Sequence, residues 1–186
     1  MKILVIGDTH KIIDKAYETC LLEKDCDLII HCGDYYADAL ELAKQLDRAI
    51  IAVNGNCDGV KIPDSKIQTI ATPYGKIMVS HGHRQHVKQG LDELVDLAIE
   101  RNCVAVCYGH THTPSIEESR GIYLINPGSI TRPRDGESGS YAIIQCDKNG
   151  LKAQIKKLGS SSKSDGKSKP AKEGKLRALL NYSDRF

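Results

Sequence analysis

The first fifty residues alternate short apolar runs with segments whose apolar residues recur at helical spacing. The apolar runs cover residues 2–6, 28–30 and 49–53. An unbroken run of this kind is typical of a strand that is buried on both faces. Between the runs, apolar positions in residues 13–21 and 39–46 recur at intervals of three and four, which predicts two helices. The order β-α-β-α-β favours a parallel sheet covered by helices.

The pattern changes after residue 66. Thr72-Pro73-Tyr74-Gly75 separates two apolar runs and predicts a hairpin, and Asn149-Gly150 predicts a second one. We therefore expect the second half to be mostly antiparallel and the whole to be an α/β sandwich of mixed sheets. The expected strands are 67–71, 76–80, 104–108, 122–125, 141–145 and 151–155, with a helix over 91–98.

The composition indicates the cellular compartment in which the chain is expected to work. No apolar stretch approaches the roughly 20 residues that span a bilayer, and the run before Asp8 is too short for a signal peptide. The seven cysteines form no Cys-x-x-Cys pair, and Cys103 and Cys107 lie inside an apolar run. We expect buried thiols, no disulfide framework, no contact with membranes and a cytoplasmic location.

Charge is distributed unevenly. Residues 1–150 carry 16 Lys and Arg against 21 Asp and Glu, whereas residues 151–186 carry 10 against 3. After Leu158 the chain becomes rich in Gly, Ser and Lys, which predicts a flexible basic linker over 159–175 and a short segment over 176–186. Such a tail can be simply solvated, or it can contact nucleic acid, an acidic partner or the acidic residues 1–150 of the same chain.

The informative residues follow the predicted strands, where α/β folds place their ligand sites. Each of five turns carries Asp, Asn or His, and each alone is a weak signal. Mixed carboxylate, amide and imidazole groups suit Mn, Fe, Zn or Ni, and seven of them fit two ions that share a carboxylate. We expect Mn, with Ni, Fe, Zn or Mg as alternatives. The predicted ligands are Asp8, His10, Asp34, Asn56, His81, His110 and His112.

The order Asp-x-His, Gly-Asp, Gly-Asn-x-Asp, His-Gly-His, Gly-His-Thr-His over residues 1–157 resembles the calcineurin-like metallophosphoesterase superfamily. Its small bacterial and archaeal phosphodiesterase branch is the closer match, and the retromer scaffold subunit is also similar. The resemblance implies a phosphoesterase domain over 1–158, folded as two mixed β-sheets flanked by helices. It further implies that Asp34 bridges two metals. Asp8, His10 and His112 would hold one ion, and Asn56, His81 and His110 would hold the other.

One position departs from the larger members of the superfamily, which carry His after the Gly-Asn pair. This chain has Cys57 there, as the small branch does, and a thiol is a poorer general acid than an imidazolium. His83 is a candidate replacement, so we count Asp34, Asn56, Cys57 and His83 as candidate catalytic residues. Asp58 is expected to orient a neighbouring loop, and His31 to serve packing.

Together these residues predict a phosphodiesterase in which a metal-bridging hydroxide attacks phosphorus. The alternative is a scaffold that uses the same fold as a binding surface without catalysis. The expected partner is a phosphodiester substrate, with nucleic acid possible through the basic tail. Assembly into homo-oligomers stays open, as do the natural substrate and the cellular metal.

Overall fold

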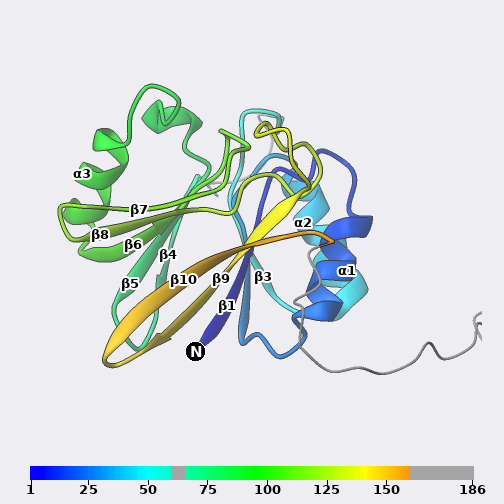
Figure 1. The fold of residues 1–186 in the computed structure, drawn as a ribbon, viewed down its shortest axis with the longest axis horizontal. Helices are drawn as coiled ribbons and strands as arrows, with labels where there is room; N and C mark the ends of the chain where they lie inside the picture. Colours follow the sequence, from blue (N-terminus) through cyan, green and yellow to red (C-terminus); the bar gives the residue numbers. More distant parts are fainter. Residues whose placement is uncertain (60–65, 160–186) are drawn as a thin grey trace, which may run out of the picture.

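The computed structural model describes residues 1–59 and 66–159 (Figure 1). Almost all of the predicted basic linker and the whole C-terminal segment lie outside the described residues. Within the described ranges, no helix combines the length and the apolar character that crossing a membrane would need.

The first sheet contains five strands in the order β10-β9-β1-β2-β3. β1, β2 and β3 are parallel, while β9 pairs antiparallel with β1 and with β10. This parallel unit confirms the β-α-β-α-β prediction. Its elements are β1 (Lys2–Ile6), α1 (Asp14–Leu22), β2 (Leu28–His31), α2 (Tyr36–Leu46) and β3 (Ile50–Ala52), with β9 (Ser140–Asp147) and β10 (Gly150–Lys157).

The second sheet also has five strands, in the order β4-β5-β6-β8-β7. The hairpin of β4 and β5 is confirmed, and so is the helix α3 that packs on this sheet. The elements are β4 (Ile67–Ala71), β5 (Lys76–Ser80), the 3-10 turn η1 (His83–Gln85), α3 (Asp92–Glu100), β6 (Cys103–Cys107), β7 (Ser115–Ser119) and β8 (Ile122–Asn126).

The second half is mostly antiparallel, as expected, through the pairs β4–β5, β7–β8 and β9–β10, but two of its features were not predicted. The centre of the second sheet is parallel, because β6 pairs in parallel with both β5 and β8, and only the outer pairs are antiparallel. The strand β7 was missed altogether. Its sequence Ser115–Ser119 is polar and largely exposed, so an edge strand formed by backbone pairing alone leaves no apolar pattern to find.

The alternation of side chains along β1 explains why its apolar run is continuous. Ile3 and Val5 pack between the two sheets against residues such as Val79, whereas Leu4 and Ile6 face α1 and α2. Both faces of the strand are therefore buried, as predicted. The same arrangement aligns the carboxyl ends of the parallel strands of both sheets, and the loops that leave these ends carry the predicted ligands.

Candidate metal centre

The seven predicted ligands come from five loops that leave β1, β2, β3, β5 and β6. Five of the seven have backbone φ between 49° and 72°, a left-handed conformation that non-glycine residues seldom adopt: Asp8, His10, Asp34, His110 and His112. Strained backbone of this kind persists only where the surrounding structure enforces it, and it clusters at functional sites. The turns after the strands thus aim these side chains at a common point.

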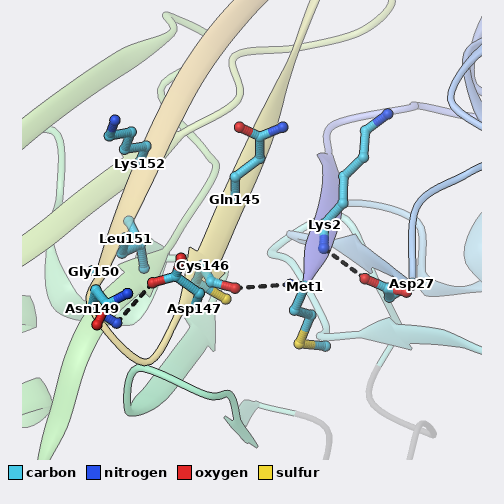
Figure 2. A pocket seen from close by; sticks show the side chains of 10 residues that line it. All are labelled: Met1, Lys2, Asp27, Gln145, Cys146, Asp147, Asn149, Gly150, Leu151 and Lys152. Atoms are coloured by element: carbon cyan, nitrogen blue, oxygen red, sulfur yellow. Dashed lines mark hydrogen bonds between the residues drawn. The ribbon is translucent and has the colours of Figure 1, made fainter.

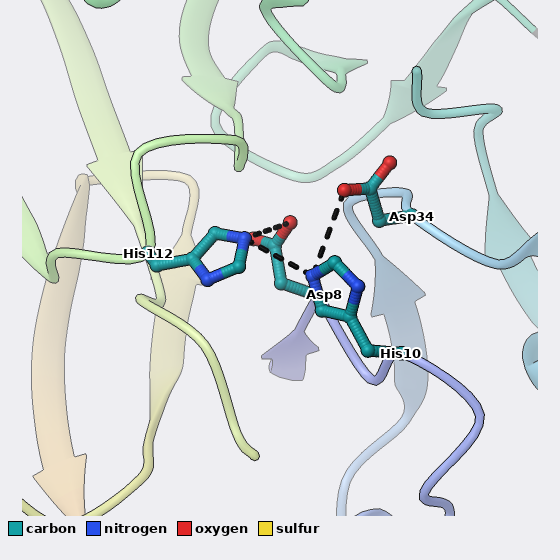
Figure 3. A group of neighbouring side chains, drawn as sticks. All are labelled: Asp8, His10, Asp34 and His112. Carbon is teal, nitrogen blue, oxygen red and sulfur yellow. Dashed lines mark hydrogen bonds and ion pairs between the residues drawn. The ribbon is translucent and has the colours of Figure 1, made fainter. Parts of the chain in front are cut away.

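One group of ligands consists of Asp8, His10, Asp34 and His112, all of them buried (Figure 3). Their potential ligand atoms all lie within 4.8 Å of one another. The Nε2 atoms of His10 and His112 are 3.1 Å apart, and Asp34 Oδ2 lies 3.6 Å from His10 Nε2. Figure 3 shows one Asp34 oxygen turned toward His10 and the other turned away from the group.

The second group is centred on the remaining oxygen of Asp34. Asp34 Oδ1 lies 3.3 Å from His81 Nε2, and Asn56 Oδ1 lies 3.2 Å from the same nitrogen. The ring of His110 packs edge-on to His81 at a centroid distance of 5.1 Å. The two oxygens of Asp34 therefore face two separate sets of imidazoles.

The histidine rings are oriented by backbone carbonyls. His81 donates from Nδ1 to the carbonyl of Cys32 at 2.8 Å, and His112 donates from Nδ1 to the carbonyl of Arg132 at 2.8 Å. A carbonyl can only accept, so Nδ1 of each ring carries a proton and Nε2 is the nitrogen that can face the site with a lone pair. This is the tautomer that a metal ion needs, held by the partners that usually orient metal-binding histidines.

Burial controls the protonation of the rings. It lowers the pKa of His10, and together with the neighbouring His81 it lowers the pKa of His110 to about 4. Burial also opposes protonation of His112, but the adjacent Asp8 carboxylate outweighs it and raises the pKa of His112. His10 and His110 are therefore neutral at pH 7, with lone pairs available to a cation.

Two features fit a bound metal. Asp8 Oδ1 is buried and accepts no hydrogen bond from any described residue; His112 Nε2 lies 3.4 Å away, and a bound cation would further compensate this carboxylate. The Nε2 atoms of His10 and His112 lie 3.1 Å apart, close enough for both to bind one ion. The residues present thus suit a divalent cation.

Contacts around the ligands fix the loops that carry them. A side chain at Gly55 would lie 2.0 Å from Asp34 Oδ1, so only glycine allows this approach. Asp58 accepts hydrogen bonds from the backbone N–H groups of Tyr36 and Gly55 at 2.7 Å each, so it orients two loops as expected. His31 is fully buried and hydrogen-bonds to Thr9, in agreement with a packing role.

Cys57 and His83 stand beside the second group. The backbone N–H of Cys57 donates to Asp34 Oδ1 at 3.0 Å, and partial burial together with Asp34 raises the pKa of its exposed thiol to about 11. The thiol is therefore protonated at neutral pH and is a poor nucleophile. The His83 ring lies 5.2 Å from His81 and 6.1 Å from His110, and its Nδ1 is buried without a hydrogen-bond partner among the described residues.

The family of the chain follows from sequence comparison. Residues 1–149 match the model of the calcineurin-like phosphoesterase superfamily domain. The chain belongs to this superfamily. Its fold of two mixed sheets flanked by helices and its order of motifs agree with that membership.

Relatives and solved structures extend the comparison. Probable metallophosphoesterase YsnB of Bacillus subtilis is 36% identical over 146 residues, which cover 77% of this chain and 83% of YsnB. Phosphodiesterase YfcE of Escherichia coli is 31% identical over 118 residues, 60% of each chain. A Streptococcus pneumoniae protein described as a predicted phosphoesterase superposes with a TM-score of 0.72 at 25% identity, covering 84% of this chain and 88% of that one. Vps29 of Entamoeba histolytica in complex with zinc also gives 0.72, at 22% identity, covering 87% and 95%, which establishes a shared fold.

The candidate centre of this phosphoesterase opens into a depression of about 340 Å³. Its lining includes five of the seven predicted ligands, all but Asp8 and His81. It also includes three basic residues that sequence reasoning missed, namely Lys88, Arg132 and Arg134. Two of them occur in the sequence Thr131-Arg132-Pro133-Arg134, in the loop between β8 and β9. The Arg-Pro-Arg sequence marks a basic loop, but it does not indicate against which part of the chain that loop folds.

A larger hollow of about 610 Å³ lies elsewhere, at the start of β1 (Figure 2). Its polar groups bond to one another, because Met1 donates to the Cys146 carbonyl at 2.8 Å and the backbone N–H of Lys2 donates to Asp27 at 2.7 Å. None of the predicted ligands lines it. The predicted ligands that line a depression lie instead in the smaller one, at the carboxyl ends of the strands.

Proposed function

We propose that this chain is a two-metal phosphodiesterase whose ions are held on the two sides of Asp34. The observation that carries the proposal is the position of the two Asp34 oxygens, 3.6 Å from His10 Nε2 and 3.3 Å from His81 Nε2. Asp8, His10 and His112 would complete one coordination shell. Asn56, His81 and His110 would complete the other.

Bound there, two divalent cations would neutralise the charge of a phosphate and supply a nucleophilic hydroxide near neutral pH. The mixed oxygen and nitrogen donors favour Mn, with Ni, Fe, Zn or Mg as alternatives. The residues of the chain provide the geometry. Asp8 and Asp34 offset the charge of the cations, and the carbonyls of Cys32 and Arg132 hold the rings of His81 and His112.

Cys57 and His83 would act at the step in which the leaving group departs. A thiol whose pKa is raised to about 11 is a weak acid, so Cys57 gives little help to a poor leaving group. His83 has a buried Nδ1 without a hydrogen-bond partner among the described residues, and we assign it the role of hydrogen bonding to a phosphate oxygen or to the leaving group. Diesters with good leaving groups should accordingly be the best substrates.

The name of the relative YfcE supports phosphodiesters as the substrate class. The shared fold of Vps29 favours the second candidate function, a scaffold that binds partners without catalysis. A scaffold has no need of buried carboxylates at the carboxyl ends of its strands, and this chain has both Asp8 and Asp34 there.

The deciding assay compares bis(p-nitrophenyl) phosphate, a diester, with p-nitrophenyl phosphate, a monoester. Metal-free protein is reloaded separately with Mn, Ni, Mg and Zn. We expect hydrolysis of the diester with at least one metal, Mn being the foremost candidate, and slower hydrolysis of the monoester. Protein that binds two ions and hydrolyses neither ester with any metal would be a scaffold.

A further inference from the structure

Three cations, Lys88, Arg132 and Arg134, line the depression above the candidate centre, and we call them the basic mouth. Lys88 follows η1, and both arginines lie in the loop between β8 and β9. All three side chains are exposed, and none forms an ion pair or a side-chain hydrogen bond with any described residue. Some other cations are paired, for example Lys2, which contacts Glu23 and Asp25 at 2.9 and 2.6 Å.

The backbone fixes the two arginines relative to the ligands. The Arg132 carbonyl accepts from His112 Nδ1 at 2.8 Å, and the Arg134 N–H donates to the His112 carbonyl at 3.2 Å. The Arg132 N–H donates to Ser129 Oγ at 2.8 Å, and that hydroxyl donates to the Asp8 carbonyl at 2.8 Å. The loop is thus bonded to two ligand loops at once, while the guanidinium groups stay available.

The charge of the mouth differs from that of the body. Residues 1–150 carry five more acidic than basic residues, yet Asp34 is the only carboxylate among the described residues that line the depression. A cationic rim on an acidic body concentrates anions at that rim. Two divalent ions would already neutralise the phosphate that reacts, so the three further cations are in excess for a diester with a single negative charge.

We propose that the basic mouth binds a second phosphate group of the substrate, so that the preferred substrate is a phosphodiester with a further phosphate beside the scissile one. Arginine suits this task because its planar donors match phosphate oxygens. The inference rests on the proposed function and specifies the substrate class of the same site.

The test compares two substrates with the same leaving group, thymidine 5′-(p-nitrophenyl phosphate) and its 3′-phosphorylated form. For the wild-type protein, kcat/KM should be about tenfold or more higher for the 3′-phosphorylated form, as expected for hydrogen bonds to a charged group. Titration calorimetry gives a readout free of turnover. Thymidine 3′,5′-bisphosphate should bind about tenfold or more tighter than thymidine 5′-monophosphate.

Substitutions assign the preference to the mouth. In Arg132→Gln and Arg134→Gln the ratio of kcat/KM values should fall toward one, and Arg132→Lys should retain part of it. Arg101→Gln is the matched control, because Arg101 is also exposed and unpaired but lies before the start of β6, at the opposite end of that strand. This control should keep the wild-type ratio.

The outcomes separate the two proposals. Hydrolysis of both esters with a ratio near one in the wild-type protein, together with equal affinity for the two nucleotides, overturns the role of the mouth and leaves the phosphodiesterase intact. A ratio that survives in both arginine variants also overturns it. Hydrolysis of neither ester refutes the proposed function, and the inference about its substrate falls with it.

Discussion

The two groups of ligands that meet at Asp34 differ in burial and charge. On one side, Asp8, His10 and His112 are all buried, and with Asp34 they present two carboxylates. On the other side, His81 is buried but Asn56 is exposed and His110 is half-buried, and the shared Asp34 is the only carboxylate of this group. Attraction between charges is stronger where water is excluded. We therefore expect the Asp8 side to bind its ion more tightly and to release it more slowly.

The largest effect should come from the residue that both sides share. In Asp34→Asn the size of the side chain is kept, but a charge and one good oxygen donor are lost. At least one ion should be lost or bound more weakly, and phosphodiesterase turnover should fall by roughly three orders of magnitude. Elemental analysis and the aryl diester assay measure the two effects.

Asp27→Asn is the matched control for this variant. Asp27 precedes β2 and Asp34 follows it, so the two carboxylates lie at opposite ends of one strand. The control should keep its metals and its rate, and circular dichroism should show that both variants fold. An Asp34→Asn protein with full metal content and an unchanged rate would contradict the assignment of Asp34 as a bridge.

A smaller and more selective effect is expected at the exposed side. In Asn56→Ala the affinity for one ion should fall by about 10- to 100-fold, and excess metal should restore much of the turnover. Affinity for the other ion should change little, because the Asp8 side keeps its two carboxylates. Metal titration followed by calorimetry separates the two binding events, with Gln145→Ala, an exposed position on β9, as control. An equal loss of affinity for both ions would contradict the proposed difference between the two sides.

The smallest effect should be that of Cys57→Ala. The thiol is protonated and exposed, and an aryl leaving group needs little help from an acid. We expect the rate on an aryl phosphodiester to fall by less than about tenfold, below the usual contribution of a general acid. A loss near a thousandfold with both metals still bound would show that the thiol takes part in catalysis.

Much of the fold could be predicted because burial leaves a pattern in the sequence. The run from Ile3 to Ile6 packs on both sides of one sheet, and its residues belong to two separate clusters of the core. β7 left no such pattern, because Glu117 and Glu118 are exposed and the strand is held by its pairing with β8. The parallel centre of the second sheet was also missed, since the order of strands depends on contacts between distant segments.

The candidate site, like the fold, has one part that could be predicted from the sequence and one part that could not. The meeting of the predicted ligands at one place could be anticipated because each follows a strand, and parallel strands bring their carboxyl ends to one edge. The positions of Arg132 and Arg134 could not be predicted, because they depend on hydrogen bonds between the backbone of these residues and His112. For Arg134 this partner lies more than 20 residues away in the sequence. The sequence around a basic loop residue does not indicate which other loop it will pack against.

The most direct test of the central claim is electron paramagnetic resonance of the wild-type protein loaded with Mn²⁺, combined with its metal content. If Asp34 joins two ions, the protein should bind two Mn²⁺ per chain at saturation, and their spectrum should be that of an exchange-coupled pair. Asp34→Asn should lose the coupled signal. A single ion per chain, or two ions that give only the spectrum of isolated Mn²⁺, would contradict the two-metal centre.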